Sequence, residues 1–452
     1  MNNLSPHTFH IPVLGIGYSI DTPAKVAHLG INSVVSLLDD MLMEKMREFH
    51  SRRLKLPFQP IHEKTDDCRA KRITAYLNLL DEIVKQKVAD LKASMEQKQE
   101  AINQYFESLQ EKSVLRQKFE TIRNQWNQID LRAWIQENLT PGAIDVNIMT
   151  KVDKENYAND QKLPAQFNDG HAALRGFANR SLQSSVVFSA GLNPGIYQYL
   201  TTFDDFFPQE DFTLRKRIIL KVSDFRSAII QGKYLVKKGL WVSEFRIESG
   251  LNCGGHAFPS DGQLLGPVLE EFREKRDELT SLLFELYRQA LLRLGKPCPD
   301  IVPPLYISAQ GGVGTSEEHE FLLEHYQLDS VGWGTPFLLV PEAVNIDEQT
   351  LAMLCNAGEE DIVLSNISPL GVPFHNLKGN SKDLEKEAYI QNNTPGNPCP
   401  KKYAALNHEF GDKSLCTASR KYQRLKLDEL NQKELPLEEH HREFGRITEK
   451  SC

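Results

Sequence analysis

The chain has 452 residues, of which 40% are hydrophobic and 25% are charged. This length fits a barrel with insertions, and the composition allows a large soluble core. The net charge is -8, with no dense basic tract, so we expect no nucleic-acid partner. No apolar run reaches the roughly 18 residues of a membrane span, and the N-terminus does not resemble a signal peptide. The seven cysteines, an odd number, favour reduced thiols in a cytoplasmic protein.

Two strands are predicted at the start of the chain, His10–Gly17 and Asn32–Leu37, with a helix between them at Ala24–Leu29. Strand and helix alternating over so short a stretch indicate a parallel α/β architecture. Gly15 and Gly17 supply half of a dinucleotide-binding fingerprint. The third glycine and the helix spacing are absent, so a Rossmann fold is disfavoured.

From residue 39 to residue 138 the pattern becomes helical. Apolar residues recur at spacings of three and four between Ile73 and Met95, and again between Leu115 and Ile129. This periodicity predicts long amphipathic helices that form a hairpin with a break near Ser113. We interpret the segment as a helical insertion that serves packing, as a lid, or as the surface of a homo-oligomer. No catalytic pattern is visible in it.

Strand signals then resume, alternating with helices. Six strands are predicted: Ala143–Met149, Ser185–Ser189, Arg217–Val222, Trp241–Glu248, Leu305–Ala309 and Ser330–Trp333. The helices predicted around them are Ala172–Leu182, Pro194–Phe203, Phe225–Lys238, Leu265–Leu294 and Glu317–Tyr326. With the first two strands this makes the eight of a (β/α)₈ TIM barrel. We therefore expect an α/β barrel built by residues 1–38 and 139–378, the helical insertion 39–138 after its second strand, and a polar C-terminal extension over 379–452.

Glycine turns follow the last two predicted strands. Gly311-Gly312-Val313-Gly314 precedes Thr315-Ser316-Glu317-Glu318, which is typical of a helix N-terminus, and Gly332–Thr335 follows the next strand. Amides in such turns can approach a phosphate, and the helix dipole adds to the attraction. Barrels commonly bind phosphate after the seventh and eighth strands. The alternative is that these glycines serve only tight bends or helix ends.

A histidine follows two glycines at another predicted strand end, in the loop Ser249–His256. Gly254 and Gly255 let the backbone run close to a flat ligand and leave the imidazole exposed. An imidazole that titrates near neutral pH is suited to proton transfer. His256 is therefore the candidate catalytic residue, the alternative being an ordinary polar side chain.

The blocks Gly254-Gly255-His256, Ala309-Gln310-Gly311-Gly312 and Gly332-Trp333-Gly334-Thr335-Pro336-Phe337 together resemble the signature blocks of the nitronate monooxygenase family. These are FMN-dependent barrels, formerly grouped as 2-nitropropane dioxygenases, and FMN-dependent enoyl-ACP reductases are similar to them. The resemblance implies FMN across the barrel mouth, with its phosphate at the two glycine turns, on Gly311, Gly312, Gly334 and Thr335 beside Gly332. It also implies that Gly15, Gly17, Asn147 and Gly254 line the isoalloxazine ring and that His256 is the catalytic base.

Departures from the family lie on the substrate side. Asn252-Cys253 stands where members usually have Glu-Ala, and Ser249 stands where they often have glutamine. Lys221 is a further candidate cofactor residue, because a cation at a strand end could stabilise negative charge on reduced flavin. It could equally be a salt-bridged structural lysine.

Three functions stay open. The first is an FMN oxidoreductase that oxidises nitronates or a related acidic carbon substrate with O₂, and the second is an enoyl-thioester reductase that uses NAD(P)H. The third is a flavin-binding scaffold or assembly protein. Cys253 also allows a weaker alternative, thiolate attack as in IMP dehydrogenase. Cys399, Cys416 and Cys452 lack a CxxC pair, so no metal site is predicted.

Overall fold

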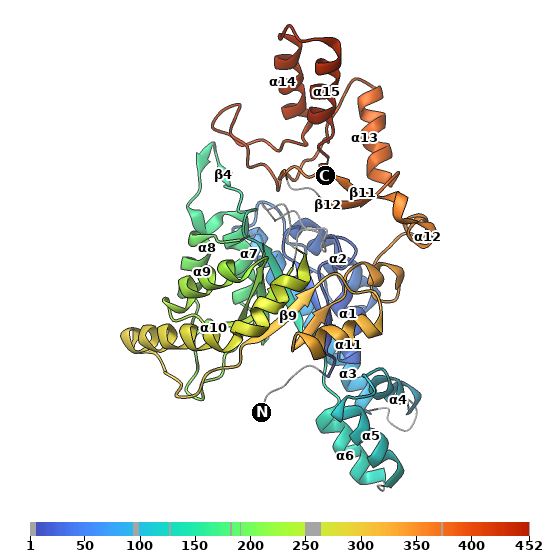
Figure 1. The fold of residues 1–452 in the computed structure, drawn as a ribbon, viewed down its shortest axis with the longest axis vertical. Coiled ribbons are helices and arrows are strands. Elements are labelled where there is room, and N and C mark those ends of the chain that lie inside the picture. The colour runs from blue at the N-terminus through green and yellow to red at the C-terminus, as the bar shows by residue number, and fades with distance from the viewer. Residues whose placement is uncertain are drawn as a thin grey trace.

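The computed structural model describes residues 6–93, 99–125, 128–180, 183–189, 191–248, 264–371 and 374–451. At its centre is a closed barrel of eight parallel strands in the order β1-β10-β9-β8-β7-β6-β3-β2 (Figure 1). The strands are β1 (Phe9–Ile11), β2 (Asn32–Ser36), β3 (Ile144–Met149), β6 (Ser184–Ser189), β7 (Lys216–Val222), β8 (Val242–Ile247), β9 (Tyr306–Gln310) and β10 (Ser330–Gly332). They are the eight strands predicted from the sequence, and the TIM-barrel fold is confirmed.

The strand β8 shows how the sequence divides between the outside and the inside of the barrel. Successive side chains of a strand point to opposite faces. Phe245 and Ile247 belong to the hydrophobic core between strands and helices, where Phe245 packs on Phe272. Glu244 and Arg246 therefore face inward, where Glu244 accepts a hydrogen bond from Ser308 of β9. The barrel interior is consequently polar along this strand.

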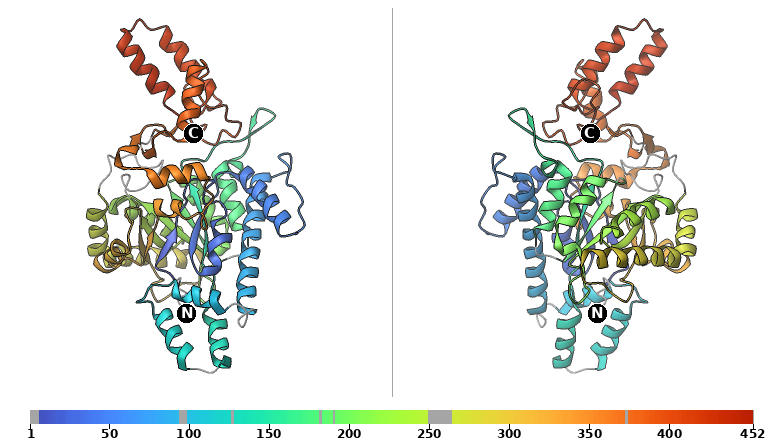
Figure 2. Two further views of the ribbon diagram at one scale, coloured as in Figure 1. Left: turned by 90° about the vertical axis from the view of Figure 1, so that its right-hand side faces the viewer. Right: turned by 90° about the vertical axis from the view of Figure 1, so that its left-hand side faces the viewer.

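Helices surround the barrel and cover the outward faces of its strands (Figure 2). They include α1 (Thr22–Val26), α3 (Cys68–Ala93), α7 (Asp169–Ala178), α8 (Pro194–Tyr199), α9 (Phe225–Val236), α10 (Leu265–Leu294) and α11 (Ser316–His325). The helix α10 has the bounds predicted from the sequence. It ends at Gly295, whose φ of 63° is the left-handed conformation that glycine adopts readily.

The predicted insertion is more divided than a single hairpin. It contains α2 (Asp40–Arg53), α3, α4 (Gln99–Glu107), α5 (Val114–Gln125) and α6 (Gln128–Asn138). The helix α3 packs closely on α7. A Cβ added to Gly176 of α7 would lie only 2.8 Å from the carbonyl oxygen of Ala70 of α3. The break near Ser113 separates α4 from α5. The helices α4–α6 form a separate lobe at the end of the barrel opposite the C-terminal elements (Figures 1 and 2), with stacked Phe106 and Phe119 in its core.

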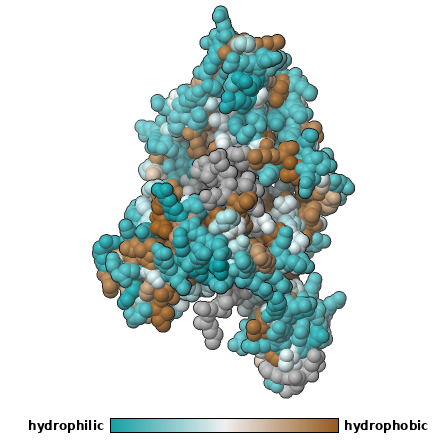
Figure 3. All heavy atoms as spheres, viewed as in Figure 1, coloured by the Kyte–Doolittle hydropathy of each residue, from teal (hydrophilic) through white to brown (hydrophobic). Residues whose placement is uncertain are grey.

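The C-terminal elements lie at the other end of the barrel, beyond the carboxyl ends of its strands (Figures 1 and 2). They are α12 (Glu348–Asn356), the antiparallel pair β11 (Ile362–Ser365) and β12 (Phe374–Leu377), α13 (Ser381–Gln391), α14 (Arg420–Asn431) and α15 (Leu437–Thr448). Their surface is largely hydrophilic in Figure 3. Among the described residues no helix is long and apolar enough to cross a bilayer.

Candidate functional site at the mouth of the barrel

Three inward side chains from consecutive strands meet at the carboxyl end of the barrel. Lys221 is aligned with Arg246 of β8, and Ile247 is aligned with Ala309 of β9. Glu248, the residue after β8, and Gln310, the last residue of β9, therefore lie at the level just above. We call Lys221, Glu248 and Gln310 the mouth triad.

The mouth triad is joined by direct polar contacts. Lys221 forms an ion pair with Oε2 of Glu248. The Nε2 of Gln310 donates a hydrogen bond of 2.8 Å to Oε1 of Glu248. The Glu248 side chain is 3% exposed and that of Lys221 is 16% exposed. Of the two alternatives for Lys221, the salt-bridged lysine is therefore present, and both oxygens of Glu248 have partners.

A second charged pair lies one layer deeper in the barrel. Both Nε and Nη2 of Arg246 are 2.9 Å from Oε1 of Glu244. The hydroxyl of Ser308 donates to the same oxygen at 2.5 Å. The two layers each combine one cation with one carboxylate.

His10 faces the same interior from β1 and is fully buried. Burial lowers the pKa of His10 well below its ordinary value, and the positive charge of Arg246 lowers it further. The imidazole is therefore neutral at physiological pH. Gly332 of β10 makes room for it, because a Cβ there would be 2.6 Å from Nε2 of His10 and 2.9 Å from Cγ of Gln310. The structure thus shows a steric role for Gly332, whereas its predicted part in cofactor binding stays a prediction.

In the glycine turn after β9, the amides of Gly311, Gly314 and Thr315 have acceptors within the protein, whereas none is seen among the described residues for the amides of Gly312 and Val313. Gly311 and Gly312 have φ angles of 85° and 70°. The amide of Gly311 donates to the carbonyl of Gly332 at 3.0 Å. The amides of Gly314 and Thr315 both donate to Oε2 of Glu318, at 2.7 and 3.1 Å. The N-terminus of α11 is consequently capped by its own carboxylate, in a capping box between Thr315 and Glu318.

The turn after β10 is more open. Gly334 precedes the short 3₁₀ helix Thr335–Leu339, and a Cβ added to it would meet no atom within 4 Å. Within the described parts of the chain, no group accepts a hydrogen bond from the amides of Gly334 and Thr335. The backbone amides of half-buried Gly334 and exposed Thr335 therefore offer two adjacent donors of the kind that binds a phosphate oxygen.

Trp333 fixes this turn through a buried histidine of α11. The Nε1 of Trp333 donates to Nδ1 of His319 at 3.0 Å, and Nε2 of His319 lies 3.0 Å from the hydroxyl of Thr8. Burial lowers the pKa of His319. Its neutral ring therefore accepts from Trp333 and donates to Thr8, which ties the turn to the segment before β1.

The other predicted ring-lining residues described by the structure are Gly15, Gly17 and Asn147. Gly15 has a φ of 61°, and Gly17 is exposed with no atom within 4 Å of an added Cβ. Asn147 alternates with the core residues Val146 and Ile148, so its half-buried side chain faces the barrel interior. No hydrogen bond of its side-chain amide is seen to another described residue. These positions, with Gly334 and Thr335, fit a flat ligand that carries a phosphate.

Gly254, Cys253 and the candidate catalytic His256 lie outside the described residues, as does Cys452. Cys399 and Cys416 form no disulfide with any described residue. In the described ranges, no group of three or more His, Cys, Asp or Glu side chains is arranged to hold a metal ion.

The sequence interpretation missed Glu248, Gln310 and His10. A signal for the first was present in residues 243–248, SEFRIE, where charged residues alternate with aromatic or branched ones. That period of two predicts inward carboxylates at Glu244 and Glu248. The contribution of His10 depends on Gly332, which is distant in sequence, and no local pattern marks it.

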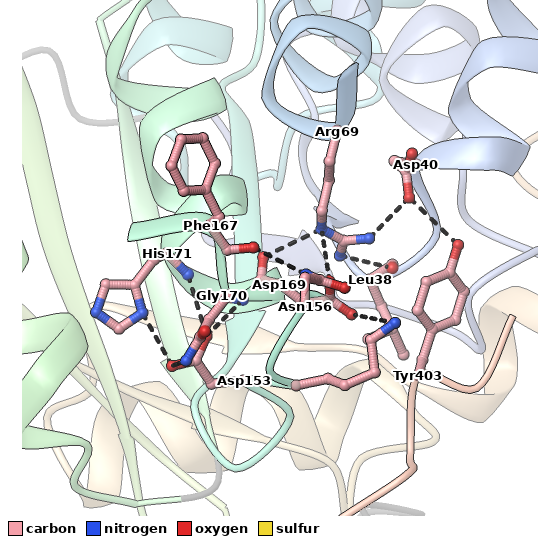
Figure 4. A network of polar contacts seen from close by, with 12 residues as sticks. Leu38, Asp40, Arg69, Asp153, Asn156, Phe167, Asp169, Gly170, His171 and Tyr403 are labelled. Carbon is pink, nitrogen blue, oxygen red and sulfur yellow. Dashed lines mark hydrogen bonds and ion pairs between the residues drawn. The ribbon is translucent and has the colours of Figure 1, made fainter. Parts of the chain in front are cut away.

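A second polar network lies beside the mouth, at the end of β2 (Figure 4). The guanidinium of Arg69 donates to Asp40 at 2.7 Å and to the carbonyls of Leu37 and Leu38 at 3.1 and 2.8 Å. The hydroxyl of Tyr403 lies 3.1 Å from Oδ1 of Asp39 and 3.3 Å from Oδ1 of Asp40. This network fastens the C-terminal segment to the rim of the barrel.

The Tyr403 hydroxyl is a hydrogen-bond donor in this network. Burial raises the pKa of Tyr403, and the nearby carboxylates of Asp40 and Asp39 raise it further. The phenol therefore stays protonated and donates to these carboxylates. Lys401 adds an ion pair with Asp39.

No family model matches the chain, and no curated protein matches it. Among solved structures, it is similar to the enoyl reductase domain of MlnA from the macrolactin biosynthesis cluster of Bacillus amyloliquefaciens, with a TM-score of 0.37 and 14% identity over 74% of this chain and 70% of that one. It is also similar to nitroalkane oxidase from Streptomyces ansochromogenes, with a TM-score of 0.38 and 12% identity over 83% of this chain and 78% of that one. At such scores neither likeness says what this chain binds or does.

Proposed function

We propose that the chain is an FMN-dependent oxidoreductase that oxidises a nitronate or a related acidic carbon substrate with O₂. The observation that carries the proposal is the open turn after β10, where the amides of Gly334 and Thr335 have no acceptor among the described residues. This turn follows the eighth barrel strand, the position where barrels commonly bind phosphate. Of the two glycine turns, the turn after β10 is the better phosphate site. The other turn leads into the N-terminus of α11, where the carboxylate of Glu318 already caps the helix and would repel an anion.

Each residue then has a defined task. The backbone amides of Gly334 and Thr335 donate hydrogen bonds to the phosphate. The flavin ring is bordered by the Asn147 side chain and by the backbone of Gly15 and Gly17. Bound FMN would supply the electron acceptor for substrate oxidation. His256, assigned from the sequence resemblance, takes the proton from the substrate carbon.

The phosphate contact is tested by an isosteric pair of variants. Thr335→Glu places a carboxylate at the exposed turn, whereas Thr335→Gln adds the same volume without charge. Titration of the flavin-free proteins with FMN should show an affinity loss of at least about tenfold for the Glu variant, or ~1.4 kcal/mol, and little change for the Gln variant. Equal FMN affinity in the two variants would contradict phosphate binding at this turn.

The catalytic assignment is tested by His256→Asn. This variant should retain bound flavin but lose about 10²–10⁴-fold in turnover of the neutral carbon acid. A preformed nitronate has already lost its α-proton and should be oxidised with a smaller loss. Comparable losses on both substrates would remove the base role.

The electron-transfer partner separates the two enzyme proposals. Anaerobic bleaching of the flavin by a nitronate, without bleaching by NAD(P)H, supports the oxidase. Rapid bleaching by NAD(P)H followed by reoxidation with an enoyl thioester would instead identify a reductase.

A further inference from the structure

The mouth triad contains a cation that is already matched by a carboxylate. Lys221 is paired with Glu248, and Glu248 is held from the other side by Gln310. The pair below it, Arg246 and Glu244, is also matched. His10 is neutral because burial lowers its pKa. These inward groups therefore sum to zero charge.

A matched pair acts differently from a single cation on a nearby ligand. A lone ammonium in a site of low effective dielectric attracts a negative charge strongly, whereas an adjacent carboxylate cancels most of that attraction. The Glu248 side chain is almost fully buried, so water does little to weaken its effect. The ion pair also fixes the long Lys221 side chain against the wall formed by β7 and β8.

We infer that Glu248 is a positioning residue that holds Lys221 and cancels its charge, and thereby disfavours negative charge on a flavin bound at the mouth. This inference rests on the proposed function, since it concerns the FMN site. Glu248 thereby lowers the reduction potential of the flavin, because reduction adds electrons to the ring and the neutral triad gives the resulting anion little stabilisation. Glu248 acts by cancelling the charge of Lys221, so removal of both side chains should leave the potential near that of the wild type.

Four variants test the inference as a charge cycle: Glu248→Gln, Lys221→Met, the double variant, and Glu244→Gln as the matched control. Glutamine at position 248 retains an oxygen that can accept from Gln310 while removing the charge. The control makes the same change two inward positions deeper, within β8, where the carboxylate neighbours Arg246 and Ser308.

The first readout is the midpoint potential of the bound flavin. The second is its affinity for sulfite, which adds to the oxidised ring and leaves the ring of the adduct negatively charged. Glu248→Gln should favour the reduced form by at least about tenfold, which is ~30 mV for a two-electron couple, and should tighten sulfite binding in parallel. Lys221→Met should shift both in the opposite direction. The double variant should return to within about threefold of the wild type.

Two results would overturn the inference. One is a Glu248→Gln potential equal to that of the wild type or to that of Glu244→Gln. The other is a double variant whose potential stays with that of either single variant instead of returning to the wild-type value.

Thermal unfolding of the same proteins tests the ion pair without flavin. Lys221→Met leaves Glu248 buried and unpaired, so its Tm should fall by several degrees, and the double variant should recover most of the loss. Additive Tm changes would overturn the pairing itself. If the double variant shows this recovery but the wild-type protein binds no flavin, the result would instead overturn the proposed function and the control of potential that depends on it.

Discussion

At the scale of single residues, several histidines are kept neutral by burial. The pKa of His10 lies well below 6.5, and that of His28 is lowered to about 4, mainly by burial and then by the charge of Lys87. Burial also lowers the pKa of His7 and of His319. His319 shows the structural role of a neutral imidazole. Its Nδ1 accepts a hydrogen bond from Trp333, and its Nε2 contacts the hydroxyl of Thr8.

These histidines predict a loss of stability in mild acid. Their folded pKa values lie below the unfolded value, so the unfolded chain takes up protons first as the pH falls. The stability is present above pH 6.5 and should fall as the pH drops from about 6.5 towards 4, by at most ~1.4 kcal/mol per pH unit for each histidine. His28→Gln should flatten the dependence of the urea midpoint on pH, whereas the exposed His62→Gln should keep it. A His28→Gln protein with the wild-type slope would contradict the assignment.

A second prediction concerns the close approach of β10 to His10. Gly332→Ala would place a methyl group 2.6 Å from a ring nitrogen of His10, in a buried position. The crowding should cost about 1–3 kcal/mol in the free energy of unfolding. Gly17→Ala is the control, because an added Cβ there has no neighbour within 4 Å. A wild-type unfolding midpoint for Gly332→Ala would show that the barrel interior relaxes around the added group.

At the scale of elements, the barrel strands were predictable because each is a short run of branched and aromatic residues bounded by turns. The insertion was harder to interpret, because a period of three or four residues marks a helix but not its partner. The apolar residues from Ile73 to Met95 predict one helix of a hairpin. Over its described length, to Ala93, this segment instead lies on α7, where Gly176 permits backbone contact that no local pattern reveals.

This division of the insertion leads to different expectations for two deletions. Replacing residues 99–138 with a short Gly/Ser linker should leave a soluble barrel, because the Nζ of Lys92 at the end of α3 lies 2.7 Å from the carbonyl of Gln136, so the ends of the lobe are close. Removing α3 as well should give insoluble protein, since α7 loses its cover. Expression with size-exclusion chromatography checks both. Aggregation of the shorter deletion would show that the lobe belongs to the barrel core.

At the scale of the whole molecule, the barrel places the two glycine turns at one end, as the sequence predicted. The sequence could not show that Glu318 occupies the amides of Gly314 and Thr315, because the same residues suit a helix cap and a phosphate site. It also could not show that Tyr403 reaches Asp39 and Asp40, since this contact joins distant segments.

The charge arrangement belongs to the same scale. The mouth has two layers of matched pairs, neutral His10 and a turn whose Gly334 and Thr335 amides have no acceptor in the part of the chain that the structure describes. The C-terminal segment is fastened to the rim beside it. The open turn is the part of this arrangement on which the proposed FMN site depends.

The most direct measurement of this account is the absorption spectrum of the purified chain after titration with FMN, with mass identification of the chromophore released on denaturation. The account predicts a flavin spectrum with one FMN per chain, and an affinity for FMN that is at least about tenfold weaker in Thr335→Glu but little changed in Thr335→Gln. A folded wild-type protein that stays colourless and shows no saturable binding of added FMN would contradict it.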